Sequence, residues 1–369
     1  VDSYGISPFE HAISLNNEEL INLLIDTNKI DYSAKITQKF FNNIYYRDLT
    51  LAKNLFSFVI KSLNKDTIIK ILNNPSFDSK KVDLLNCFAH EYESSILHIK
   101  KANIDILDIL YEYDKEHEKL IDLNQLLPSG KSYFTAIQKK TSNLIETVKF
   151  FIDRGVDPNI VDSYGISPFE HAISLNNEKF INLLIDTNKI DYSISVQFNK
   201  KFLNIFELSI YKLNTNTVTK ILQNSSFDSK SVKFIKIFNK ILNHFNTRPS
   251  IDIMNMLYEY DKEHEQLIDL NQLLPNGKSY FTSIPTYITN IDEVFKFFID
   301  HGTDPNIVDS NGISLFECAI TSNNEKLINL LIDTNKIDYS RPIKSNKKFY
   351  KTVKNMNLFE IVINNCKKD

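Results

Sequence analysis

The sequence repeats itself over long stretches, and this self-similarity constrains the fold more than any other feature. Residues 161–193 repeat residues 1–33 with only Glu19 and Leu20 replaced, by Lys179 and Phe180, and a third copy spans 308–340. A second block at 111–135 returns at 258–282. Repetition at a fixed offset is typical of stacked repeat architectures, so we expect a row of similar modules.

A shorter period lies inside the long one and is marked by a phenylalanine at the start of an apolar stretch. Successive phenylalanines of this kind are 32 to 47 residues apart, and the order of long and short spacings recurs every four units. We predict a single solenoid of about ten units over residues 1–369, with a four-unit block at 1–160, a second at 161–307 and a partial one at 308–369. The marker residues are Phe9, Phe56, Phe88, Phe134, Phe169, Phe206, Phe238, Phe281, Phe316 and Phe359.

Each unit is predicted to begin with a helix. A Ser or Asn lies two residues before the marker in nine of ten units, with Lys236 as the exception. Its side-chain oxygen can accept a bond from a free amide of the first turn, and five units add a glutamate that completes a capping box. The caps are Ser7, Asn54, Asn86, Ser132, Ser167, Asn204, Ser279, Ser314 and Asn357, and the glutamates are Glu10, Glu170, Glu207, Glu317 and Glu360.

A second helix is predicted after a short Asn-rich turn. Residues 178–186 carry apolar side chains at three- and four-residue spacing, which gives one apolar stripe. Helices this short are marginal alone in water, so neighbouring units must bury the stripes. The units around Phe88 and Phe238 have extra residues, and we expect longer helices or loops there.

Residues 150–186 resemble an ankyrin repeat. The segment from Gly155 to Asn159 is similar to that family's turn after the second helix, and Asp162 to Pro168 is similar to its hairpin entry. The likeness is strong for the units that start near 1, 161 and 308, and weaker near 130 and 277. Glu170 departs from the family pattern, which usually has His there. The resemblance implies an all-α solenoid of stacked helix-turn-helix repeats.

The resemblance also implies a function as a protein–protein interaction scaffold or adaptor that binds a partner protein on a concave groove. The alternative is a targeting arm of a larger enzyme whose catalytic domain lies outside these residues. Tyr4 and Tyr164 are expected to contribute most, because aromatic side chains dominate interface energies. Ile6 and Ile166 could instead pack against the neighbouring hairpin. The implied partner-binding residues are Ser3, Tyr4, Ile6, Ser14, Leu15, Ser163, Tyr164, Ile166, Ser174, Leu175, Ser310, Asn311, Ile313, Thr321 and Ser322.

Composition restricts the class of partner. The 43 basic and 46 acidic side chains are mixed along the chain, which argues against nucleic acid, and no apolar run is long enough to span a membrane. Three distant cysteines without a CxxC pair favour a reducing compartment, so we expect a cytoplasmic or nuclear monomer. Because the chain starts at Val1 and the last unit lacks a second helix, we expect a fragment of a longer protein.

Three motifs suggest chemistry, but each has a simpler interpretation. Gly-Lys-Ser at 130–132 and 277–279 lacks the first glycine of a phosphate loop, since Gln125 and Gln272 occupy that place. A turn glycine followed by a capping serine accounts for it. The partial nucleophile-elbow pattern at 165–169 lacks its last glycine, and the acidic stretches at 112–118 and 259–265 favour solvated helix ends over a metal site. We therefore expect no enzyme activity, metal or cofactor.

Overall fold

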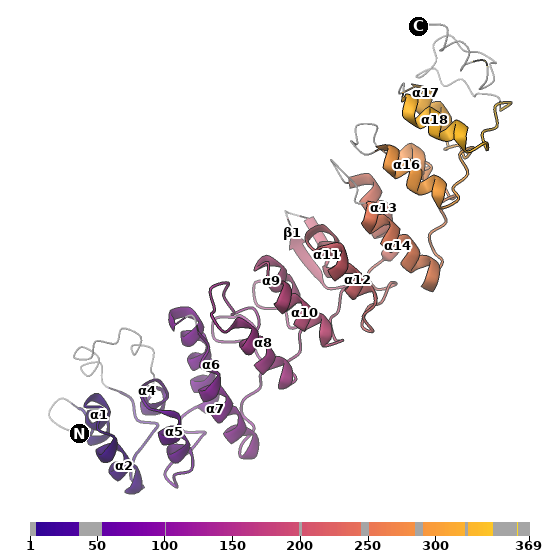
Figure 1. Cartoon of the computed structure of the whole chain (residues 1–369). Helices are drawn as coiled ribbons and strands as arrows, with labels where there is room; N and C mark the ends of the chain where they lie inside the picture. Colours follow the sequence, from indigo (N-terminus) through magenta and orange to yellow (C-terminus); the bar gives the residue numbers. More distant parts are fainter. Residues whose placement is uncertain are drawn as a thin grey trace. The chain divides into compact units, whose positions relative to one another are not determined.

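The computed structural model describes residues 5–36, 54–99, 101–198, 201–244, 251–284, 291–321, 324–341 and Glu360. These residues form short helices joined by turns, with one two-stranded hairpin among them (Figure 1). Unit 1 comprises Val1–Lys212 and Asn224–Phe227, and unit 2 comprises Leu213–Gln223 and Asp228–Asp369. The predicted all-α repeat fold is confirmed, and each of the two compact units contains several of the repeats.

Unit 1 contains helix pairs in which a first helix is followed by a second one. The first helices are α1 (Pro8–Ser14), α4 (Leu55–Ser62), α6 (Leu84–Ser94), α9 (Pro168–Ser174) and α11 (Ile205–Lys212). The second helices are α2 (Glu18–Asp26), α5 (Lys65–Leu72), α7 (Ile104–Glu116), α8 (Leu144–Asp153) and α10 (Glu178–Asp186). A π-helical turn, η2 (Ser95–Ile99), extends α6. Strands β1 (Ser195–Phe198) and β2 (Lys201–Asn204) pair antiparallel just before α11, a hairpin that sequence patterns did not predict.

Unit 2 continues the same alternation. Its helices are α12 (Thr215–Leu222), α13 (Phe234–His244), α14 (Ile251–His264), α15 (Tyr280–Ser283), α16 (Ile291–Asp300), α17 (Leu315–Thr321) and α18 (Glu325–Asp333). The longer helices expected around Phe88 and Phe238 are confirmed, since α6 and α13 have 11 residues where α1 has seven.

The marker phenylalanines form the core of the repeats. Nine of them, from Phe9 to Phe316, are at most 3% exposed, while Phe359 lies outside the described residues. Phe169 meets Tyr192 edge-on at 5.8 Å between ring centroids, and Phe9 meets Tyr32 in the same way at 6.0 Å. The short period of the sequence therefore places one buried ring in each described repeat. Neighbouring segments of the chain cover these rings.

Most predicted helix caps are confirmed. Capping boxes close at Ser7 with Glu10 and at Ser314 with Glu317. Asn86 was predicted wrongly, because α6 begins two residues earlier and Asp83 caps it. Side-chain oxygens of Asn54, Ser132, Ser167, Asn204 and Ser279 each accept the predicted backbone bond. Asn357 lies outside the described residues.

The first helices expected at Ser132 and Ser279 are shorter than predicted. Residues 132–136 form only turns, and α15 has four residues. Thr135 and Thr282, instead of glutamates, accept the backbone N–H of the capping serine. The N–H of Gln138 bonds to the hydroxyl of Thr141, a side-chain bond that takes the place of a helical one.

Asparagines in the loops after the second helices link one repeat to the next. Asn159 Oδ1 accepts the N–H of Asp191 at 2.8 Å, and its amide donates to Lys189 O at 2.7 Å. In unit 2, Asn306 makes the same two bonds, to Asp338 N at 2.8 Å and Lys336 O at 2.7 Å. These bonds fix the spacing of the helix pairs within each unit. They therefore also fix the positions of the loops at the other end of each pair.

Candidate functional site

Tight hairpins precede several first helices, and their tips touch within each unit. In unit 1 one hairpin closes with a bond from Leu127 N to Lys131 O and the next from Asp162 N to Ile166 O, at 2.8 and 3.0 Å. The N–H of Ser163 donates to Gly130 O at 2.8 Å, so the tips are bonded to each other. In unit 2, Ser310 N donates to Gly277 O at 2.7 Å. Each unit therefore has a pair of hydrogen-bonded tips.

This contact requires glycine at one of the two tips. Gly130 and Gly277 have φ of +79° and +75°, where glycine alone has no steric cost. A Cβ added to Gly277 would lie 2.5 Å from Ser310 Oγ, and one on Gly130 would be closer still to Ser163 Oγ. Each tip glycine thus lies against the serine side chain of the next tip, and an added Cβ would clash with that serine.

Buried aspartates hold the shape of the second tip. Asp162, 6% exposed, accepts the N–H groups of Tyr164 at 2.9 Å and Ile166 at 3.0 Å. Asp309 does the same for Asn311 and Ile313 in unit 2, at 2.8 and 3.0 Å. A carboxylate that satisfies two backbone amides makes the tip rigid, so the side chain at its apex is presented at little entropic cost.

Tyr164 occupies such an apex and is 68% exposed. The matching residue of unit 2 is Asn311, also exposed. Leu126 and Val161 directly precede the two hairpins of unit 1 and are 41% and 39% exposed. The hairpins of unit 1 therefore carry one exposed aromatic side chain at an apex and two partly exposed aliphatic side chains at their bases, a composition suited to protein contacts.

The other predicted binding residues fall into three groups. Ser14, Leu15, Ser163, Ser174 and Ser310 are exposed, and Ile6, Ile166, Leu175 and Ile313 are half-buried. The hydroxyls of Ser14 and Ser174 donate to His11 O and His171 O in their own helices, both at 2.7 Å. Thr321 is the last residue of α17. Ser3, Tyr4 and Ser322 lie outside the described residues.

His171, on α9, links its repeat to the preceding one. Its Nε2 lies 2.7 Å from Ile137 O, and since a carbonyl only accepts, this nitrogen carries the proton. Burial lowers the pKa of His171, which favours the neutral ring. The equivalent residue in unit 2 is Cys318, whose pKa burial raises to about 12. His171 therefore joins two repeats through its bond to Ile137 O.

The motifs that suggested chemistry have structural roles. Ser279 caps α15 and Ser132 caps a turn, each after a turn glycine and each 2% exposed, as the simpler interpretation predicted. In the acidic stretch of unit 1, Asp114 accepts the N–H groups of Leu120 and Ile121 at 2.9 and 2.8 Å. Among the described residues, no group of three or more His, Cys, Asp or Glu side chains could hold a metal ion. No helix in that part of the chain is long and apolar enough to cross a membrane.

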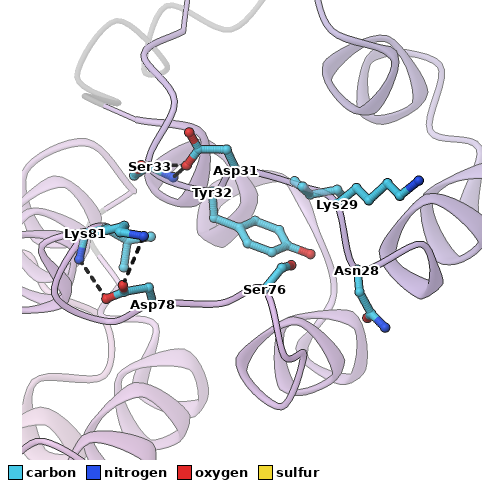
Figure 2. A pocket seen from close by; sticks show the side chains of 10 residues that line it. Asn28, Lys29, Asp31, Tyr32, Ser33, Ser76, Asp78 and Lys81 are labelled. Atoms are coloured by element: carbon cyan, nitrogen blue, oxygen red, sulfur yellow. Dashed lines mark hydrogen bonds and ion pairs between the residues drawn. The ribbon is translucent and has the colours of Figure 1, made fainter.

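A small pocket of about 240 Å³ lies in unit 1 beside the loop after α2. Figure 2 shows Tyr32 with its hydroxyl toward Ser76, and Asp78 near Lys81. Burial raises the pKa of Tyr32. Lys81 pairs with Asp78 at 3.5 Å and Ser33 donates to Asp31 at 2.6 Å, so both carboxylates of the pocket are already engaged. The pocket offers no set of nucleophile, base and orienting group.

Sequence reasoning missed a second feature, an open groove of about 470 Å³ in unit 2 between α13 and the hairpin that closes at Leu274. Its lining residues are Ile235, Lys236, Asn239, Leu274, Pro275 and Asn276. One signal did point to it. Lys236 was the only residue to break the helix-cap pattern, at a place where the two copies of the block differ in sequence.

No family model matches the chain, and no curated protein matches it in sequence. Among solved structures it is similar to the human ASB11 ankyrin repeat domain, at 9% identity and a TM-score of 0.34, over 79% of this chain and 98% of that one. By its own geometry, with paired helices, hairpin entries and bonded tips, the described part of the chain is a helical repeat protein.

Proposed function

We propose that this chain is a protein-interaction module that binds a partner protein along the hairpin tips and the first helices. The observation that carries the proposal is the pair of tips in unit 1, where bonded backbones and the buried carboxylate of Asp162 hold Tyr164 rigid and 68% exposed. A rigid aromatic side chain at an exposed apex gives contact area with little loss of conformational entropy on binding.

Further support comes from the different roles of the polar residues and the exposed apolar residues. The groups that could have served chemistry are helix caps, loop bonds or contacts between repeats, while Tyr164 at a hairpin apex is exposed. Fold alone does not identify a partner. We propose the concave groove of the ankyrin-type repeat as the binding surface, with the predicted residues at the tips as its centre.

The second candidate is a targeting arm of a larger enzyme. It shares the binding surface and differs only in what lies beyond these residues. We also keep the prediction that residues 1–369 form one solenoid, because the same links between repeats recur within each unit. Small-angle X-ray scattering of the whole chain tests that prediction. A profile of one elongated particle supports it, and a profile of two compact bodies that move independently contradicts it.

The proposed function is tested by a pull-down from cell lysate. The proteins captured by the parent chain are compared with those captured by the Tyr164→Ala and Leu23→Ala variants. Leu23 is 65% exposed on α2, a second helix, and serves as the matched control. We expect Tyr164→Ala to lose most of a captured protein that the parent and Leu23→Ala retain. Equal capture by all three chains would contradict the proposed surface, and no specific capture by the parent would contradict the function itself.

A further inference from the structure

The groove in unit 2 is apolar on its inner surface. Ile235 lies on α13 and is half-buried, and Leu274 and Pro275 come from the facing hairpin. A volume of about 470 Å³ lies within the range of small-molecule and peptide side-chain pockets, about 300–1,000 Å³. The groove can therefore take an apolar side chain from a bound segment.

Lysines border this apolar surface. Lys236 lines the groove, and Lys240 lies one turn later on the same face of α13, next to the stripe that carries Ile235 and Asn239. Lys233 precedes the helix and is exposed. From residue 229 to residue 244 the sequence contains no acidic residue, so α13 presents a locally positive face beside an apolar groove.

The equivalent region of unit 1 has the opposite charge. The helix α6 is capped by Asp83 and carries Glu91 and Glu93. Burial raises the pKa of Glu91 to about 7, but Glu93 Oε1 accepts the N–H of Ser129 at 3.1 Å and so joins α6 to the facing hairpin. One copy of the block thus bridges the gap with a carboxylate, and the other leaves an apolar groove edged by ammonium groups.

We propose that the groove between α13 and the hairpin at Leu274–Lys278 binds an acidic peptide segment of a partner protein, with one apolar side chain against Ile235 and Leu274 and a flanking carboxylate on Lys236. This inference rests on the proposed protein-binding function and specifies the chemistry of one bound segment. Charge complementarity chooses the occupant, since lysines at an interface steer acidic partners and disfavour basic ones.

Single-stranded nucleic acid is the other anionic occupant that lysines attract. It relies on exposed aromatic rings on which bases stack. The phenylalanines of α13 do not offer such rings, because Phe234 is 3% and Phe238 0% exposed, and the groove is lined by aliphatic side chains. The groove therefore favours a peptide with an aliphatic side chain.

The test uses a fluorescein-labelled synthetic peptide of aspartates and glutamates around one central leucine, titrated with the whole chain in fluorescence anisotropy. Two control probes replace the leucine by serine or every acidic residue by lysine. We expect the acidic leucine probe to bind, the serine probe to bind about tenfold more weakly and the basic probe not to bind, with affinity falling as salt rises.

Single substitutions test whether the peptide binds in the groove. Lys236→Glu is expected to weaken the acidic probe about tenfold. Lys326→Glu makes the same charge change on α18, where Lys326 is 85% exposed, and is expected to leave binding unchanged. Ile235→Ala provides a second variant that tests the apolar contact without adding charge. Circular dichroism confirms that each variant folds.

Three outcomes would overturn the inference: no binding of the acidic probe, equal loss with Lys236→Glu and Lys326→Glu, or displacement of the probe by an oligonucleotide that binds more tightly. Partner capture that depends on Tyr164 would persist in any of these cases if the proposed function holds. Failure of the groove and failure of the function are therefore distinguishable.

Discussion

Unit 1 and unit 2 contain copies of the same block that agree in their frame and differ on their surface. The bonded tips, the glycines at positive φ and the loop asparagines recur in both units with distances within about 0.1 Å. The faces of α6 and α13 differ instead in charge, from Asp83 and Glu93 in one to Lys233 and Lys236 in the other. Features that hold repeats together have stayed, while the exposed helix faces have diverged.

The difference shows which residues the fold requires. A side chain at a tip glycine is strained, because φ is positive there and an added Cβ would clash with the serine side chain of the next tip. A lysine or glutamate on an exposed helix face costs the fold little in either copy. Divergence on such faces is therefore the expected place for differences in what each unit binds.

The largest effect should come from the core, and it should be the same in both units. Phe88→Ala in unit 1 and Phe238→Ala in unit 2 each remove a 0% exposed ring and should lower the free energy of unfolding by about 3–5 kcal/mol. Phe202→Ala, which removes a ring that is 75% exposed on β2, should change it by less than about 0.5 kcal/mol. Urea denaturation measures all three. A much smaller loss for either buried ring would mean that the frame is not shared.

Next in size is the effect of a methyl group at the tips. Gly130→Ala and Gly277→Ala combine a strained φ, which costs about 1–2 kcal/mol, with a clash against the serine of the next tip. Gly155→Ala is the matched control, since it has φ of +74° and nothing within 4 Å of the added carbon. We expect both tip variants to lower the thermal midpoint more than the control does. If all three are equal, the tips are not in close contact.

Acid should distinguish the two units. The native-state pKa of His171 is lowered from its ordinary 6.5, so stability present above that pH is lost as the pH falls through the native-state value. Cys318 does not titrate in this range, because its pKa is about 12. From pH 7 to pH 5, the protection factors for amide hydrogen exchange, which are corrected for the slower intrinsic exchange at lower pH, should fall more in α9 than in α17. The variant His171→Gln keeps a donor for Ile137 O and should remove part of the loss of protection at low pH. Glu170 is present in the parent chain and in the variant, so its titration is common to both.

The smallest effect concerns the bridge between α6 and its hairpin. Glu93→Asn introduces the residue found at the matching position of unit 2, Asn243, and should cost at most about 1 kcal/mol because the bond is exposed. Urea denaturation measures the loss in free energy of unfolding. Fluorescence anisotropy with the acidic peptide shows whether the change weakens the repulsion between unit 1 and the peptide. A cost above 2 kcal/mol, taken as well over the usual value for such a bond, would mean that Glu93 belongs to the frame.

Sequence predicted the features that depend on local chemistry. The buried phenylalanines and most helix caps were predicted because a marker and its cap lie two residues apart. Asn86 failed because Asp83, three residues earlier, competed for the same helix start. The contact between Gly130 and Ser163 and the groove between Ile235 and Leu274 each join residues more than 30 positions apart, which no local pattern specifies.

The most direct test of the shared frame is hydrogen exchange at the amides of Ser163 and Ser310, resolved by NMR. Both amides lie in exposed turns, yet each donates to the carbonyl of the preceding tip. We predict that they exchange as slowly as amides within α9 and α17, and that Gly130→Ala accelerates Ser163 while leaving Ser310 unchanged. Exchange of both amides at the rate of an unprotected loop would contradict the account.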